Sequence, residues 1–198
     1  YRRQRQMCIR DRSCVVVDDT RYALGRIARS YKQLFRTISV AVTGSVGKTT
    51  TKQFIYSVLD TKYKTNETKG NYNNEIGLPL TLLGLTAVHK ALVVEMGMNH
   101  KGEISELSKM VEPDISVITG IGTAHIENLG SKENIRDAKM EIIDGMKPGG
   151  ILILNGDDPY LRDVKTNDIF KIYIGIENED CVYNAENIRM FDEHMLFD

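Results

Sequence analysis

Short hydrophobic runs alternate with amphipathic segments through most of the chain. Runs rich in β-branched residues predict strands, and they are found at 38–43, 91–96, 115–119, 151–154 and 170–174, with a weaker one at 63–65. Helical periodicity is found at 48–59, 76–83, 103–110, 132–146 and, over a short stretch, 160–164. This alternation predicts an α/β fold, with a mostly parallel, doubly wound sheet that is covered on both faces.

Composition is consistent with a globular protein of one substantial domain. The chain has 198 residues, of which 41% are hydrophobic and 27% charged, so it can bury a core. No apolar run approaches the roughly 18 residues of a membrane helix, and we expect no membrane insertion. Residues 1–12 hold five of the 26 basic residues and one of the 27 acidic ones, which leaves 21 basic and 26 acidic residues in the remainder. That balance does not favour a nucleic-acid surface.

The cysteines and the two ends of the chain suggest where it works and how it is organised. Cys8, Cys14 and Cys181 have neither zinc-site spacing nor the density of a disulfide scaffold, so we expect a cytoplasmic protein. We interpret residues 1–13 as a tail or an artefact, because they lack the apolar segment of a secretory signal. Residues 183–198 predict two short strands, so we expect the sheet domain to be incomplete at its carboxyl end.

A glycine-rich segment follows the first predicted strand and runs directly into a helical pattern. It reads TGSVGKTT over residues 43–50. Glycines let successive N–H groups face one point, and the helix N-terminus adds partial positive charge, so the segment predicts an anion cradle. We expect Lys48 to neutralise the β- and γ-phosphates of a nucleotide and Thr49 to hold Mg²⁺. Val42 replaces the first glycine of the general pattern, and the alternative is a glycine-rich turn with a surface lysine.

Two residues after later strands are candidate metal ligands. Glu95 ends a run apolar enough to be buried on both faces, and a carboxylate there needs a partner such as Mg²⁺. The alternative is that Glu95 caps the helix beginning near Gly102, and position alone does not decide between the two. His125 follows the fourth strand, but loop histidines are mostly solvated and imidazole is not a typical magnesium ligand.

Lys139 lies where a charged residue is unexpected. At about 100° per residue it falls within the apolar stripe of its predicted helix, with Ile135, Ala138, Ile142, Ile143 and Met146. The plainer interpretation is snorkelling, with the stem packed and the ammonium in water. The alternative is that burial lowers the pKa of Lys139 and leaves a neutral, reactive amine.

Five segments together resemble, in order and spacing, the Mur ligases of bacterial cell-wall synthesis. They are 43–50 (TGSVGKTT), 70–79 (GNYNNEIGLP), 94–98 (VEMGM), 121–127 (IGTAHIE) and 138–142 (AKMEI), and the resemblance covers about residues 14–188. It implies an amide ligase that uses ATP and Mg²⁺ and forms an acyl phosphate on its carboxylate substrate. The implied substrates are UDP-N-acetylmuramoyl-tripeptide and D-Ala-D-Ala, with the tripeptide ending in either lysine or diaminopimelate.

The resemblance also implies roles for individual residues. Lys48, Lys139 and His125 are the implied catalytic residues, and Lys139 is the lysine that the family carbamylates. Magnesium ligation is implied for Thr49, Glu95, His125 and Lys139, and contact with the nucleotide-sugar substrate for Asn73 and Asn74. The implied nucleotide-binding residues are Gly44, Ser45, Val46, Gly47, Lys48, Thr49, Thr50 and Asn155, the last of which would contact adenine. Asp157 and Asp158, beside Asn155, could equally be a helix N-cap pair.

The family's organisation implies domain boundaries. Residues 14–36 would be the end of an N-terminal UDP-sugar domain with its linker, and 37–198 most of the central ATP-binding domain, with the C-terminal domain absent. We therefore expect a monomer that does not ligate as the 198-residue chain alone. The alternatives are another Mur-type amide ligase, a nucleotide-binding fragment without catalysis, and a phosphate-loop kinase.

Overall fold

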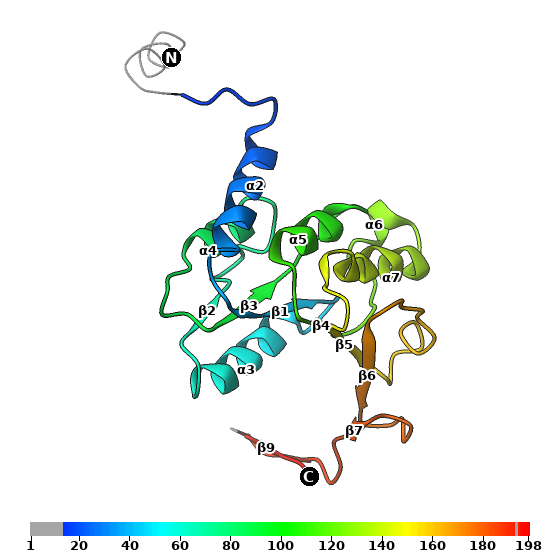
Figure 1. The fold of residues 1–198 in the computed structure, drawn as a ribbon. Coiled ribbons are helices and arrows are strands. Elements are labelled where there is room, and N and C mark those ends of the chain that lie inside the picture. The colour runs from blue at the N-terminus through cyan, green and yellow to red at the C-terminus, as the bar shows by residue number, and fades with distance from the viewer. Residues whose placement is uncertain (1–13, 193) are drawn as a thin grey trace.

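Seven parallel strands form the central sheet of this computed structural model, which describes residues 14–192 and 194–198 (Figure 1). Their spatial order is β2-β3-β1-β4-β5-β6-β7, and every neighbouring pair is parallel. The strands are β1 (Ile38–Thr43), β2 (Thr65–Glu67), β3 (Ala91–Glu95), β4 (Ile115–Ile118), β5 (Ile151–Asn155), β6 (Phe170–Gly175) and β7 (Tyr183–Asn184). The predicted mostly parallel α/β fold is confirmed.

Helices cover both faces of this sheet, as the apolar strands require. They are α2 (Thr20–Lys32), α3 (Lys48–Asp60), α4 (Gly77–Leu83), α5 (Glu103–Val111), α6 (Ile126–Leu129) and α7 (Lys132–Met140). Figure 1 shows α3 below the sheet and α4, α5 and α7 above it. Helix α2 packs against α4 and α5.

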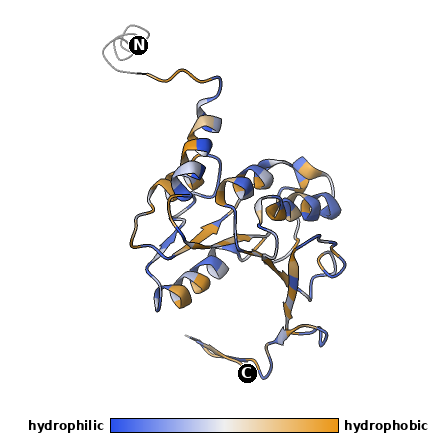
Figure 2. Cartoon of the chain, viewed as in Figure 1, coloured by the Kyte–Doolittle hydropathy of each residue, from blue (hydrophilic) through white to orange (hydrophobic). Residues whose placement is uncertain are grey.

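Alternate residues of the central strands pack into two cores, one on each face. Leu92 and Val94 of β3 belong to the larger core under α4, α5 and α7, whereas Val93 belongs to a smaller core against α3. All three side chains are fully buried, and Figure 2 shows β1 and β3 as mainly hydrophobic. Strands buried on both faces are typical of a parallel sheet. The carboxyl ends of β1, β3, β4 and β5 consequently meet along one edge.

The predicted helix at 132–146 is wrong beyond Met140. The chain continues as a 3₁₀-helix, η1 (Glu141–Gly145), because tertiary hydrogen bonds replace the α-helical ones. The Glu141 carboxylate accepts the N–H of Gly102 at 2.8 Å, at the start of α5, and Ser108 donates its hydroxyl to the Ile142 carbonyl at 2.5 Å. These bonds pin the segment after α7 onto α5.

Other expectations also need correction. The segment 160–164 forms turns rather than a helix. The strand expected at 63–65 lies at Thr65–Glu67, because the Asp60 carboxylate takes the Thr65 N–H at 3.0 Å and the ladder to β3 begins only there. Helices α2 and α6 were not predicted. The other expected strands and helices agree with the structure to within a residue at each end.

The two strands expected in 183–198 are present as β8 (Arg189–Met190) and β9 (Met195–Leu196), an antiparallel pair, and β7 is an additional strand of the main sheet. The expectations for residues 1–13, including Cys8, lie outside the described residues. Within the described part of the chain, no helix combines the length and the hydropathy needed to cross a membrane.

Candidate nucleotide and metal site

The phosphate-loop segment connects β1 to α3 at the carboxyl edge of the sheet. Gly44 has a φ of 152°, and a Cβ there would lie 1.9 Å from the Thr119 hydroxyl, so only glycine fits. Gly47 is the N-cap of α3 in the left-handed region, with a φ of 82°, and no side chain caps the helix. The first N–H groups of α3 are therefore available to an anion.

Thr119, directly after β4, holds this loop in place. Its hydroxyl donates to the Val46 carbonyl at 2.5 Å, and the neighbouring Gly120 carbonyl accepts the Ser45 N–H at 2.9 Å. The Ser45 hydroxyl is buried and has no hydrogen-bond partner among the described residues. An orphaned buried hydroxyl in an anion cradle fits a missing phosphate oxygen. Thr50 is exposed on the first turn of α3.

Two lysines converge on one carbonyl of the loop. Lys48 donates to the Gly44 oxygen at 3.0 Å, and Lys139 donates to the same oxygen at 2.9 Å. Lys139 is only 2% exposed, so the snorkelling interpretation is wrong. Burial, followed by the charge of Lys48, lowers the pKa of Lys139 from 10.5 to about 8. The structure therefore brings the two predicted catalytic lysines together.

Glu95 lies at the end of β3, beside the first turn of α3. Its carboxylate is 4% exposed and accepts hydrogen bonds from the Thr49 hydroxyl at 2.7 Å and from the Asn73 amide at 2.9 Å. The expected alternative, a cap on the helix near Gly102, is wrong because Glu141 occupies that position. Among the described residues, no basic side chain lies within 4.0 Å of Glu95 to balance its charge.

A buried carboxylate without a nearby cation is electrostatically unfavourable, and a bound divalent metal would offset its charge. Thr49 and Glu95 offer two oxygen ligands of the kind that Mg²⁺ binds. His125 is exposed at the start of α6, and its side chain makes no hydrogen bond with the described residues. The described residues contain no cluster of three His, Cys, Asp or Glu side chains that could bind a metal by themselves. Phosphate oxygens or water would complete the site.

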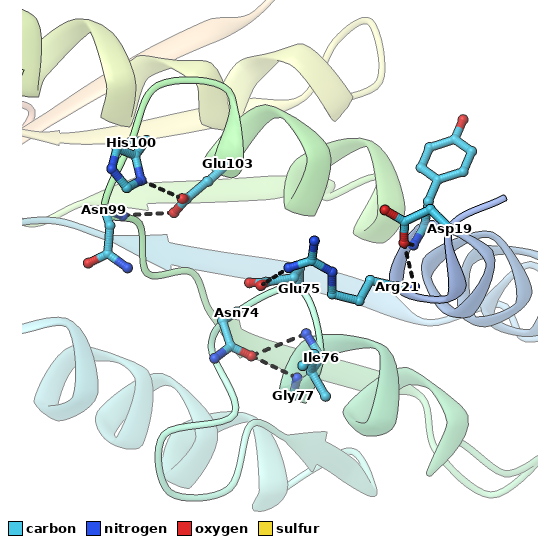
Figure 3. A network of polar contacts seen from close by, with 10 residues as sticks. Asp19, Arg21, Asn74, Glu75, Ile76, Gly77, Asn99, His100 and Glu103 are labelled. Atoms are coloured by element: carbon cyan, nitrogen blue, oxygen red, sulfur yellow. Dashed lines mark hydrogen bonds and ion pairs between the residues drawn. The ribbon is translucent and has the colours of Figure 1, made fainter. Parts of the chain in front are cut away.

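Asn73 and Asn74 have different surroundings, although both lie in the loop before α4. Asn73 contacts Glu95, whereas the Asn74 side chain accepts the N–H groups of Ile76 and Gly77 at 3.2 and 2.9 Å and starts α4 (Figure 3).

Asn74 also lines a cavity of about 510 Å³ between α2, this loop and α5. Charged residues of both signs surround the cavity, and they are Asp19, Arg21, Arg26, Arg29, Glu75, Glu103, Glu106 and Lys109.

Asn155 ends β5, and its amide donates to the Thr119 carbonyl at 3.2 Å, next to the phosphate loop. The two aspartates after it do not cap a helix. Asp158 accepts the N–H of Ile121 at 2.6 Å, and Asp157 accepts three N–H groups of the loop after β6. Asp157 and Asp158 thus fix the loops around the site.

Two buried residues that position Glu95 were missed from the sequence. The Thr68 hydroxyl, fully buried, accepts the Glu95 N–H at 3.1 Å. Lys52 of α3, 5% exposed, donates to the Thr68 carbonyl at 2.9 Å and pairs with Glu67 at 2.5 Å. Their sequence signal is weak, since a lysine on an amphipathic helix and a threonine after a short strand are ordinary features.

Comparison with known proteins identifies similar sequences and structures. The family model of the Mur ligase middle domain matches residues 42–198. The UDP-N-acetylmuramoyl-tripeptide–D-alanyl-D-alanine ligase of Bacillus subtilis is 44% identical over 179 residues, 90% of this chain and 38% of its own length. The Escherichia coli enzyme of the same name is 39% identical over 144 residues, 73% of this chain and 32% of its own length. The chain thus spans about a third to two fifths of these relatives.

Solved structures of ligases with the same fold give the same result as the sequence comparison. A crystal structure of MurF from Acinetobacter baumannii superimposes with a TM-score of 0.86 at 34% identity, covering 92% of this chain and 40% of that one. MurF ligase from Thermotoga maritima in complex with ADP gives 0.85 at 33% identity, covering 94% and 45%.

Proposed function

The chain belongs to the Mur ligase middle domain family, and from this premise we propose that it is the ATP-binding part of a ligase joining D-Ala-D-Ala to UDP-N-acetylmuramoyl-tripeptide. The observation that carries the proposal is the convergence of the phosphate loop, Lys48, Lys139 and Glu95 at one edge of the sheet. The names of the similar ligases support this choice of substrates.

The loop at residues 43–50 and Lys48 are the proposed phosphate-binding groups. The N–H groups at the start of α3 have no side-chain cap, and the Ser45 hydroxyl is buried without a partner among the described residues, so both are proposed donors to phosphate oxygens. Lys48 now donates to the Gly44 carbonyl, and it would turn toward the β- and γ-phosphates when ATP is present. Lys139 donates to the same carbonyl, and a carbamylated Lys139 would keep one N–H with which to do so when Lys48 turns away. Asn155 lies beside the loop, and we propose that it contacts adenine.

Thr49 and Glu95 are the proposed magnesium ligands, with His125 and Lys139 added as the family resemblance implies. Magnesium would offset negative charge on the phosphates during transfer. The Asn73 amide donates to one carboxylate oxygen of Glu95, and the Thr49 hydroxyl donates to the other. These two hydrogen bonds orient the carboxylate toward the phosphate loop. His125 would have to approach from the exposed start of α6.

We propose that Lys139 is carbamylated. A pKa of about 8 increases the fraction of neutral amine at pH 7 by roughly 300-fold relative to an ordinary lysine. The neutral nitrogen attacks the carbon of CO₂, so that a new N–C bond forms while the electron pair of one C=O π bond moves onto oxygen. The nitrogen then releases one proton to water, which leaves an anionic carbamate. Replacing a buried cation next to Lys48 by an anion removes a repulsion and supplies a metal ligand.

The acceptor carboxylate is proposed to arrive from the side of Asn73 and Asn74. Asn74 lines the cavity between α2 and α5, and its neighbour Asn73 contacts Glu95, so the cavity adjoins the proposed metal site. The tripeptide's terminal carboxylate would take the γ-phosphoryl group of ATP and form an acyl phosphate, releasing ADP. The amine of D-Ala-D-Ala then attacks the acyl carbon, phosphate leaves, and an amide bond forms. No side-chain nucleophile is needed.

Three alternatives predict different products. A nucleotide-binding fragment would release no phosphate with any acceptor, a phosphate-loop kinase would phosphorylate a hydroxyl, and another Mur-type ligase would use a different amine. We place the protein in the bacterial cytoplasm, where UDP-linked precursors and ATP are available. We further propose that it acts as a monomer, with residues 14–36 belonging to the end of a UDP-sugar domain.

The test measures ligation by the complete open reading frame that carries this chain. The protein is mixed with ATP, Mg²⁺, UDP-N-acetylmuramoyl-tripeptide carrying ¹⁸O in its terminal carboxylate, and D-Ala-D-Ala. We expect D-Ala-D-Ala-dependent pentapeptide and one ¹⁸O in the released phosphate. The 198-residue chain, run alongside, is expected to bind ATP without forming pentapeptide. Phosphate release without pentapeptide, or without ¹⁸O transfer, would contradict the proposal.

A further inference from the structure

A second cavity lies at the opposite edge of the sheet from the phosphate loop. It has a volume of about 430 Å³ and is lined by Lys32, Arg36, Thr37, Asp114 and Lys147, among others. These residues come from the end of α2, the connection into β1, the residue before β4 and the segment after η1. The six residues of β1, at roughly 3.3 Å each, place this cavity about 20 Å from the loop.

Lys32 is the unusual residue of this cavity. Its side chain is 5% exposed, yet within residues 14–192 and 194–198 its ammonium has no hydrogen-bond acceptor and no carboxylate within 4.0 Å. Burial, followed by the charge of Lys147, lowers its pKa. The buried side-chain polar atoms without a partner among the described residues belong to Ser45, Ser116 and Asn184, so the Lys32 nitrogen is not enclosed by protein. Because Lys32 lines the cavity, its three N–H donors open into it and are available to an acceptor from outside the chain.

Two carboxylates, Asp114 and Glu112, also line the cavity, but neither lies within 4.0 Å of the Lys32 ammonium, and each binds other groups. The two oxygens of Asp114 accept the Lys147 ammonium at 3.0 Å and the Ser39 N–H at 2.9 Å. Glu112 accepts two hydrogen bonds from Arg29, at 2.9 and 2.5 Å, and longer ones from the Gln33 amide.

We propose that this cavity binds a small phosphate-bearing anion, with Lys32, Arg36 and Lys147 as its donors. The three cations reach the cavity from separate segments, which suits a tetrahedral oxyanion better than a planar carboxylate with two oxygens. Arg36 is exposed, and its guanidinium makes no hydrogen bond or ion pair with the described residues, so it is free to close over the anion. The volume falls within the usual range of ligand pockets, about 300–1,000 Å³, and admits a phosphate with an attached small group.

The experiment is a titration of the ¹⁵N-labelled 198-residue chain with inorganic phosphate, followed by amide chemical shifts. Saturating ADP and Mg²⁺ occupy the phosphate loop, and sodium chloride keeps the ionic strength constant. We expect saturable shifts at Thr37, Ser39 and Lys147. Lys32→Met, which keeps the stem and removes the charge, should weaken binding at least tenfold. Arg36→Gln, at an exposed position that leaves folding intact, should also weaken it.

Lys64→Met is the matched control, because Lys64 is exposed and lines neither this cavity nor the one between α2 and α5. Its phosphate affinity should equal that of the unsubstituted chain. Shifts confined to residues 43–50, shifts that grow linearly without saturation, or equal affinity in the Arg36→Gln variant would each overturn the proposal. Because the two sites are read at separate amides, failure here leaves the nucleotide-binding proposal untouched.

Discussion

Replacing Lys139 by methionine tests the origin of its low pKa. The side chain is 2% exposed, and its pKa falls from 10.5 to about 8, so the folded state binds the proton less tightly than the unfolded state. The protonated ammonium therefore destabilises the fold below about pH 8, by about 3 kcal/mol at most. This cost is relieved as the pH rises from about 8 to 10.5, because the folded protein releases its proton first.

Methionine matches the packed stem of Lys139 and carries no charge. The Gly44 carbonyl keeps its hydrogen bond from Lys48, so the substitution leaves no orphaned acceptor. We expect the free energy of unfolding of the unsubstituted chain to rise relative to Lys139→Met by about 1 kcal/mol between pH 7 and 9. Urea unfolding followed by circular dichroism measures this difference, in buffers free of CO₂ so that no carbamate forms.

Lys109→Met serves as the control, because that lysine is exposed on α5 and its removal takes away a charge without changing the surroundings of Lys139. A difference between the unsubstituted chain and Lys139→Met that stayed constant from pH 7 to 9 would refute the reasoning. It would mean that Lys139 titrates as an ordinary lysine and that burial does not prepare it to react.

Three further outcomes are expected. Lys48→Ala should weaken binding of ATP and Mg²⁺ by about 10- to 100-fold in calorimetry with the fold intact, since a charge-assisted hydrogen bond is worth about 1.5–3 kcal/mol; unchanged affinity would place the nucleotide elsewhere. Glu95→Gln should remove the enhancement of ATP binding by Mg²⁺ while leaving metal-free binding within about twofold; a preserved enhancement would exclude Glu95 as a ligand. Gly145→Ala should lower the free energy of unfolding by about 1–3 kcal/mol, because its Cβ would lie 2.1 Å from the Ser108 backbone; an unchanged urea midpoint would contradict that packing.

Local pattern was sufficient for the features that depend on neighbours in the sequence. The strands β1 and β3 were predicted because buried parallel strands are apolar throughout, and the phosphate loop because glycines must stand between strand and helix. Lys139 was recognisable as unusual because it interrupts an apolar stripe. Its partner was not, since the Gly44 carbonyl is 95 residues away in the chain.

The wrong predictions concern segments whose structure depends on residues far away in the sequence. Helical periodicity continues past Met140, but the α-helix does not. The Glu141 carboxylate accepts the Gly102 N–H at the start of α5, and the chain continues from Glu141 as a 3₁₀-helix. Turns replace the helix expected at 160–164, and Asp158 before them divides its carboxylate between the Tyr160 N–H at 2.9 Å and the Ile121 N–H at 2.6 Å, on a different loop. Such long-range hydrogen bonds leave no trace in the spacing of residues, so a single sequence cannot reveal them.

The most direct test of the nucleotide and metal site is a crystal structure of the protein with Mg²⁺ and a non-hydrolysable ATP analogue. We predict the triphosphate against residues 43–50, with Lys48 turned from the Gly44 carbonyl to the phosphates. Mg²⁺ should lie about 2.0–2.1 Å from the Thr49 hydroxyl and bind Glu95 directly or through one water. A nucleotide bound elsewhere, with the 2.7 Å hydrogen bond between Thr49 and Glu95 still in place, would contradict the assignment.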